Sequence, residues 1–327
     1  MLRIFHNTKY DFIKWWKVAA ISTIAFIVIG LGSFAFTGGV NYSVEFTGGT
    51  LMQLKFKEAG DAGKIRAALE KAGIKGAEVQ RFGGADEFIV RAQETSIVEK
   101  QAAGAEKVAD QIKAALSASL GESSFTVVRQ EAISPKVGEE LSRNALIAMV
   151  LVSIATLIYL AFRFEWRFGV AAVVATLHDT LITIAFIKLL HLEVSLTVVA
   201  AILTLLGYST NDTIIIFDRV RENLRTSGKE ALYNVLNRSI NDTLPRSIMT
   251  HATTFSASLA LLLFAGEVIR PFAWVMSFGI FVATFSSIYV AAPVLLWIEQ
   301  KFPRNAASAA ATRTNSGTKR SDAVATR

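Results

Sequence analysis

Asp212 lies in an apolar run, residues 194–217, that holds no other Asp, Glu, Lys or Arg. An ionised Asp at the centre of a membrane helix costs at least about 2.5 kcal/mol, so it usually faces a partner or a water-filled path. We therefore predict a functional role for the Asp212 carboxyl, with a hydrogen-bonded structural role as the alternative. Helical spacing places Asp212 on one side of the helix with Thr204, Gly207, Tyr208 and Asn211. This side should face other helices.

Arg246 is the candidate partner of this carboxyl, because it directly precedes the next apolar span. Pro245 suits the first turn of a helix, and Asp242 or Asn241 would cap it. Arg246 would then reach the level of Asp212 and alternate between pairing with it and releasing it. An ordinary interfacial Arg that follows the positive-inside rule is an equal alternative.

Asp179 is a second ionisable residue at depth, next to His178 near the middle of another apolar span. It is a candidate relay residue, and a hydrogen bond to a neighbouring helix is the equal alternative. Small hydroxyl residues also recur at helical spacing from just before Arg246 through the fifth span. They suit close helix packing or a hydrated path, and they are Thr243, Ser247, Thr250, Thr254 and Ser258.

Six apolar spans must position these residues. The chain has 327 residues, of which 52% are hydrophobic and only 19% charged. A membrane helix needs about 20 mostly apolar residues. Three spans without Asp, Glu, Lys or Arg meet this length, and three more contain isolated polar residues. In chain order the spans are 18–37, 144–162, 168–190, 194–217, 247–266 and 271–298.

The loop charges set the expected topology. Lys and Arg gather in the N-terminal segment 1–17, in the links after the second and fourth spans, and in the tail 303–327. By the positive-inside rule these segments are cytoplasmic, so both termini lie in the cytoplasm and the first span is retained. The net charge of +7 therefore reports topology, and no nucleic-acid-binding pattern accompanies it. The tail lacks apolar periodicity and is expected to be disordered.

The segment 38–143 is then periplasmic and long enough for a small domain, followed by a five-helix membrane region over 144–302. Its pattern predicts strands at 51–57, 77–82, 87–92 and 124–131, with helices at 62–72 and 97–120. The order strand, helix, strand, strand, helix, strand is that of a ferredoxin-like α+β fold.

The sequence contains none of the common motifs of an enzyme or a cofactor site. HExxH, GxSxG, a Walker A loop and Cys–His metal spacing are missing, and there is no Cys. We therefore expect no catalytic activity, cofactor or metal, and energy for work would come from a proton gradient.

Several segments resemble the SecF family of bacterial protein-export membrane proteins, in order and with that family's spacing, from the N-terminus to about residue 301. They are VEFTGGT (44–50), LHD (177–179), LGYSTNDT (206–213), FDRVREN (217–223), NRSI (237–240) and TLPRS (243–247).

The resemblance implies a resistance-nodulation-division membrane fold in the bacterial inner membrane, and a partner, SecD, with which SecF forms a twelve-span unit. It implies action beside the SecYEG channel, after the ATPase SecA has pushed a preprotein across. Periplasmic domains would hold the emerging unfolded chain while proton flow prevents backsliding. The family's proton-coupling acid and arginine correspond to Asp212 and Arg246.

The chain departs from the family pattern at three positions: Glu45 replaces a usual Asp, Ser134 a common Gly, and His251 a small hydroxyl residue. Two other functions stay open. One is a passive scaffold that stabilises the export channel, and the other is a small-molecule efflux transporter of the same superfamily, against which the short chain argues.

Overall fold

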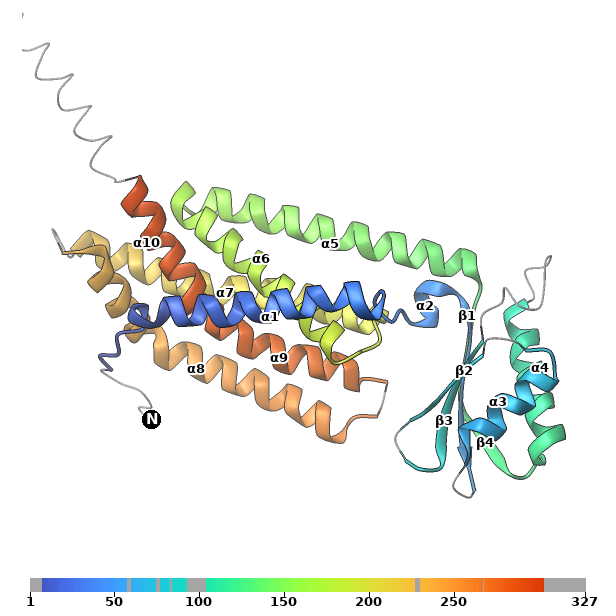
Figure 1. Ribbon diagram of the computed structural model, residues 1–327. Helices are drawn as coiled ribbons and strands as arrows, with labels where there is room; N and C mark the ends of the chain where they lie inside the picture. The colour runs from blue at the N-terminus through green and yellow to red at the C-terminus, as the bar shows by residue number, and fades with distance from the viewer. Residues whose placement is uncertain are drawn as a thin grey trace, which may run out of the picture.

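The apolar segments form long helices that lie side by side, and a small sheet domain projects from one end of the bundle (Figure 1). The computed structural model describes residues 8–57, 60–74, 77–82, 84–92, 104–226, 230–266 and 268–302. The tail 303–327 and part of the helix predicted at 97–120 lie outside these ranges, so those predictions are not tested.

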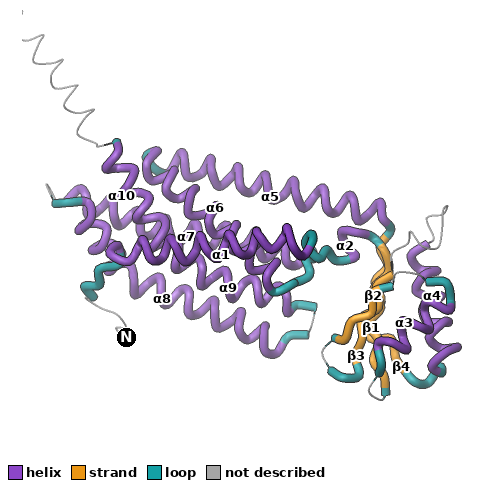
Figure 2. Tube along the Cα trace, viewed as in Figure 1, coloured by secondary structure: helices purple, strands orange, loops and turns teal. Residues whose placement is uncertain are grey.

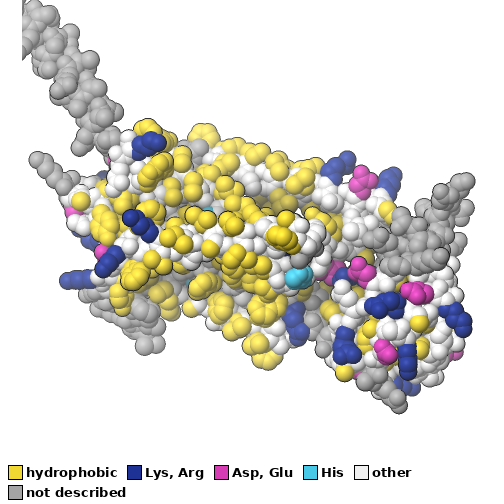
Figure 3. Space-filling model, viewed as in Figure 1, with side chains coloured by type: hydrophobic (Ala, Val, Ile, Leu, Met, Phe, Trp, Pro, Cys, Tyr) yellow, Lys and Arg dark blue, Asp and Glu magenta, His cyan; other side chains and the backbone are white. Residues whose placement is uncertain are grey.

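Within the described residues, six helical stretches are long and apolar enough to cross a membrane, which confirms the predicted number of spans. Hydrophobic side chains cover the bundle, and charged ones gather at its ends and on the sheet domain (Figure 3). The 3-10 turn η1 (Ile13–Trp15) leads into the first helix, and the last span is interrupted by a π-helical segment, η3. The elements are α1 (Trp16–Thr37), α5 (Pro135–Arg163), α6 (Trp166–Leu189), α7 (Leu196–Thr226), α8 (Leu232–Phe264), α9 (Arg270–Ser286), η3 (Ser287–Ala291) and α10 (Ala292–Lys301).

The interior of the bundle is built from α6, α7 and the last span. About half of the most apolar window of each is buried, against none for α5. Small residues allow close approach: a Cβ added to Gly279 of α9 would meet the Leu205 side chain of α7 at 2.1 Å. α5 therefore presents its apolar side chains outward, as a helix in contact with lipid does.

The predicted start of the fifth span at Pro245 is wrong. α8 begins at Leu232 and runs through Pro245. The expected capping residues serve tertiary contacts instead: Asn241 Nδ2 donates to the Tyr10 carbonyl at 2.8 Å, and Asp242 accepts from Arg219 at 2.9 Å. Because these contacts hold α8 before the proline and the Ser247 bond to Asp212 holds it after the proline, the lost backbone hydrogen bond does not end the helix.

The sheet domain has the predicted ferredoxin-like topology. Its four antiparallel strands lie in the order β2-β3-β1-β4, and α3 and α4 cover the face that points away from the bundle (Figure 2). Met52, Leu54 and Phe88 of the sheet pack there against Ile112 and Leu116 of α4. The elements are β1 (Gly49–Phe56), α3 (Ala62–Lys71), β2 (Glu78–Arg81), β3 (Glu87–Ala92), α4 (Gly104–Leu120) and β4 (Phe125–Ile133).

The VEFTGGT segment joins the two parts of the molecule. It forms the single turn α2 (Val44–Thr47), which ends at Gly48 with a φ of 70°. A Cβ at Gly48 would lie 2.6 Å from the Pro135 Cα of α5, so only glycine suits both the conformation and the contact. Glu45 Oε2 accepts from the Leu196 backbone N–H at 2.6 Å, which caps the start of α7.

An ion pair between Arg91 of the sheet and Glu193, in the loop before α7, adds a second connection. Burial raises the pKa of the Glu193 carboxyl above its ordinary value of 4.5, although the Arg91 charge opposes this shift. The junction between sheet domain and bundle is therefore a partly dry, charged contact.

Gly30 of α1 tests the packing of the bundle. Its added Cβ would lie 2.4 Å from the Ala185 Cβ of α6, whereas Gly32 has nothing within 4 Å. We expect Gly30→Ala to lower the midpoint of thermal unfolding in detergent, since overpacking costs about 1–3 kcal/mol. Gly32→Ala should be neutral or slightly stabilising, because Ala favours helix by about 1 kcal/mol over Gly. Equal midpoints for the two variants would contradict the packing of α1 against α6.

Candidate functional site

The Asp212 carboxylate is held inside the bundle by one hydroxyl donor on each oxygen. Asp212 is only 3% exposed to solvent. Ser247 Oγ of α8 donates to Oδ1 at 2.6 Å, and Ser287 Oγ of η3 donates to Oδ2 at 2.6 Å. Such short bonds to a charged acceptor are stronger than neutral ones, and they offset part of the cost of burial. At 1.5 Å per residue, Asp212 lies about 24 Å along α7 from its start.

Asp179 of α6 is a second buried carboxylate, 8% exposed. Ser286 Oγ of α9 donates to its Oδ2 at 2.7 Å, and Ser209 Oγ of α7 donates to the same oxygen. His178 Nδ1 lies 2.9 Å from Oδ1. The surroundings of the two acids are therefore connected. Ser209, which bonds Asp179, is on the same helix as Asp212, and Ser286 and Ser287, which bond one acid each, are consecutive.

Arg246 and Asn211 do not share these surroundings. Both side chains are exposed, and among the residues described Arg246 forms no ion pair with Asp212. Successive residues of an α-helix point about 100° apart, so the inward directions of Asp212 and Ser247 turn their neighbours outward. The predicted contact between Arg246 and Asp212 is thus not made in this structure, and Ser247 takes that place on α8.

The side of α7 that we predict to face other helices also contains both exposed and buried residues. Thr204 and Gly207 are exposed with Asn211, whereas Tyr208 is partly buried. The Tyr208 hydroxyl donates to the Thr250 carbonyl and lies 3.2 Å from Thr254 Oγ1, so it ties α7 to α8.

His251 contributes a further polar group to this region. Its ring packs edge-on against the Tyr208 ring at 5.2 Å. Its Nδ1 is buried and has no hydrogen-bond partner among the residues that the structure describes.

Ser209, Ser286 and Ser287 were not predicted as site residues. Ser209 lies in the LGYSTNDT segment, and the only signal for Ser286 and Ser287 is that they are adjacent serines inside the apolar run 271–298. Serine is common at helix contacts in membranes, so that signal did not separate packing from a site. Both Ser286 and Ser287 are fully buried.

Lys188, also buried, marks the sheet-domain end of α6. Its Nζ donates to the carbonyls of Gly38 and Gly39 at 2.7 and 2.6 Å, which satisfies the end of α1. The described residues contain no group of three His, Asp or Glu side chains close enough to hold a metal ion.

Two family models match the chain. One, described as "Protein export membrane protein SecD/SecF, C-terminal", matches residues 112–301, and the other, the "SecD/SecF GG Motif", matches residues 34–59. The chain belongs to the SecD/SecF family. The glycines of the second motif include Gly48, whose close packing on α5 gives the motif its structural reason.

Curated relatives of nearly equal length are SecF subunits. The chain is 66% identical over 316 residues to the protein translocase subunit SecF of Gemmatimonas aurantiaca, covering 96% of this chain and 95% of that protein. It is 39% identical over 285 residues to the SecF of Vibrio alginolyticus, covering 87% of this chain and 88% of that protein. The chain is accordingly a multi-pass membrane protein of the SecF type, a translocase subunit with a transport role.

Solved structures of SecDF share the fold. The crystal structure of Thermus SecDF, described as a translocon-associated membrane protein, matches with a TM-score of 0.78 at 35% identity. A SecDF structure in a super-membrane-facing form matches with a TM-score of 0.66, also at 35% identity. The matches cover 90% and 93% of this chain but only 39% and 40% of those chains, so this chain spans about two fifths of their length.

Ser247→Ala tests the hydrogen bond to Asp212. We expect it to lower the free energy of unfolding in detergent at neutral pH by about 1.5–3 kcal/mol, the usual value for a hydrogen bond to a charged group. Ser256→Ala is the matched control, because Ser256 is exposed on the same helix and bonds the Ala252 carbonyl of that helix. A loss no larger than that of the control would show that Ser247 does not stabilise an ionised Asp212.

Proposed function

We propose that this chain works with a SecD partner in the bacterial inner membrane and uses the proton-motive force to complete preprotein translocation. The unit would act at the periplasmic side of the SecYEG channel, after SecA has driven the preprotein across. Asp212 would be the group that takes up and releases the proton.

The buried Asp212 carboxylate carries this proposal. It is 3% exposed within an apolar bundle, and it is held by the hydroxyls of Ser247 and Ser287. Among the described residues no cation pairs with this carboxyl, so it can gain or lose its charge at the site, and each change alters which hydrogen bonds it makes. Because these donors come from α8 and η3, protonation would change how both elements pack against α7.

The exposed side of α7 and α8 supports a membrane partner. We define the α7–α8 face by its exposed polar or small residues, which are Thr204, Gly207, Asn211, Arg246 and Thr250. Lipid would penalise a guanidinium and an amide at this depth, whereas a second bundle would accept them. SecD would cover this face and bring Arg246 under the influence of the buried site.

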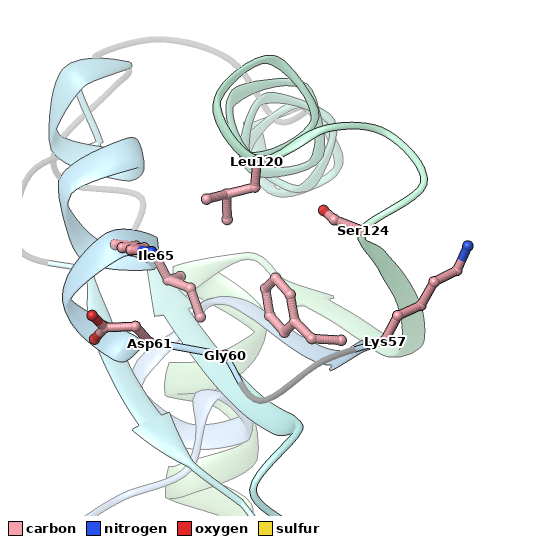
Figure 4. A pocket seen from close by; sticks show the side chains of 8 residues that line it. Lys57, Gly60, Asp61, Ile65, Leu120 and Ser124 are labelled. Carbon is pink, nitrogen blue, oxygen red and sulfur yellow. The ribbon is translucent and has the colours of Figure 1, made fainter.

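The sheet domain would contact the emerging preprotein in the periplasm. Phe56, Ile65 and Leu120 line a depression of about 410 Å³ between the helices and the strand ends of this domain (Figure 4). Both ends of the described chain lie at the opposite end of the bundle (Figure 2), which fits cytoplasmic termini.

Asp212→Asn, in cells that lack the native copy, tests the proton role. The amide keeps the shape of the side chain but cannot ionise, so we expect preprotein export in the cold to fall to the level of cells without the protein. Asp218→Asn serves as the control, since Asp218 lies on the same helix, is 40% exposed and pairs with Arg163. Normal export with Asp212→Asn would favour the passive scaffold.

The α7–α8 face can be tested by cross-linking. The chain has no native Cys, so Thr250→Cys and Leu151→Cys each introduce a single thiol. We expect Thr250→Cys to cross-link to copurifying SecD, while Leu151→Cys, exposed on α5, does not. The reverse pattern would contradict the proposed face, and copurification with an efflux partner in place of SecD would favour the small-molecule transporter.

A further inference from the structure

Two consecutive serines of the last span each bond a different buried acid. Ser286 Oγ donates to Asp179 Oδ2 at 2.7 Å, and Ser287 Oγ donates to Asp212 Oδ2 at 2.6 Å. Both serines are fully buried. The serine pair thus lies between an acid of α6 and an acid of α7.

The helix changes form at this pair. α9 ends at Ser286, and the π-helical segment η3 begins at Ser287. Short π-helical turns are rare and occur frequently at functional sites.

Each serine also has a second acceptor one turn back, the Ala283 carbonyl at 3.3 Å for Ser286 and the Thr284 carbonyl at 3.1 Å for Ser287. A hydroxyl has a single proton to donate, so each serine can bond its carboxylate or its backbone carbonyl fully, but not both.

His178 adds a further polar contact to Asp179 on the side of α6. Its Nδ1 lies 2.9 Å from Asp179 Oδ1, while its Nε2 is buried and has no hydrogen-bond partner in the described part of the chain. His178 also lines an apolar groove of about 470 Å³ between α1 and the last span, with Trp16, Tyr289 and Trp297. From the groove inward, the polar residues therefore follow one another in space in the order His178, Asp179, Ser286, Ser287, Asp212 and Ser247.

We propose that His178 and Asp179 form a second proton-binding site that is coupled to Asp212 through the hydroxyls of Ser286 and Ser287. The inference rests on the proposed proton role of Asp212 and deepens it. When one acid is protonated, its serine turns toward the backbone carbonyl, which alters the π-helical turn and the serine beside it. Asp179 and Asp212 thereby sense each other's charge.

Few other titratable groups face the two acids among the described residues. His178 of α6 contacts Asp179, whose other partners are the serines of α7 and α9. Asp212 contacts serines of α8 and η3, and Tyr208 of α7 and His251 of α8 lie about one helical turn away. Arg246 neighbours Ser247 but points outward. The two acids are therefore the groups whose charges should interact.

Carbodiimide labelling tests the coupling, because the reagent reacts with protonated carboxyl groups. The full chain with its SecD partner in lipid vesicles is labelled across a pH series, and mass spectrometry measures the midpoint pH at Asp179 and Asp212 separately. We expect Asp179→Asn to lower the Asp212 midpoint by about one pH unit, a tenfold change in proton binding, because Ser286 no longer bonds a charged acid and Ser287 is then free to donate fully to an ionised Asp212. Asp212→Asn should lower the Asp179 midpoint by the same amount, since coupling is reciprocal.

Variants of the two serines test whether their hydroxyls link Asp179 to Asp212. In the background of Ser286→Ala with Ser287→Ala, Asp179→Asn should shift the Asp212 midpoint much less. Ser277→Ala is the matched control and should leave the shift unchanged, because Ser277 is buried on α9 but bonds Ser258 at 2.8 Å. A full shift in the absence of both serines would overturn their role as the link.

Different results would refute the coupling and the proposed function. Unchanged midpoints in both single variants would overturn the coupling even if Asp212→Asn stopped export. Reciprocal shifts together with normal export would support the coupling and remove the proton role. If Asp179→Asn does not assemble, the Asp179 midpoint in Asp212→Asn decides alone.

Discussion

A carboxylate inside a hydrocarbon layer must be surrounded by hydrogen-bond donors, and the bundle is arranged around this requirement. Asp179 and Asp212 receive hydroxyl donors from α7, α8, α9 and η3, so the acids draw those elements into one contact. Serine supplies the donor with little volume, which keeps the helices close. The same hydroxyls can release the acids without leaving a fixed charge behind, as an Arg or Lys would. The interior is thus suited to a change of protonation state.

The inward direction of the acids determines which side chains are exposed on the outer surface of the bundle. Because adjacent residues diverge by about 100°, directing Asp212 and Ser247 inward directs Asn211 and Arg246 outward. The result is a polar face at membrane depth, next to an apolar α5 that suits lipid. This face is the one that the proposed SecD partner would cover.

The helices that carry the acids also hold the sheet domain. α6 bears Asp179 and, nine residues later, Lys188, which binds the carbonyls at the end of α1. α7 bears Asp212 and begins at a backbone N–H that Glu45 caps from the linker to the sheet. A shift of α6 or α7 would therefore act directly on both ends of that linker. Glu45 makes this cap in a chain whose family usually has the shorter Asp, so the longer side chain is compatible with the contact.

The sequence alone determined the six spans, the ferredoxin-like order of the sheet domain and the burial of Asp179 and Asp212. Apolar length, alternation and an isolated charge are local properties, so no tertiary information was needed. Only the tertiary structure decided that Ser247 rather than Arg246 contacts Asp212, that α8 continues through Pro245, and that Ser286 and Ser287 lie between the acids. Those outcomes depend on how each helix is rotated about its axis. That rotation is set by packing between segments far apart in the chain, such as Gly279 against Leu205, and no local pattern records it.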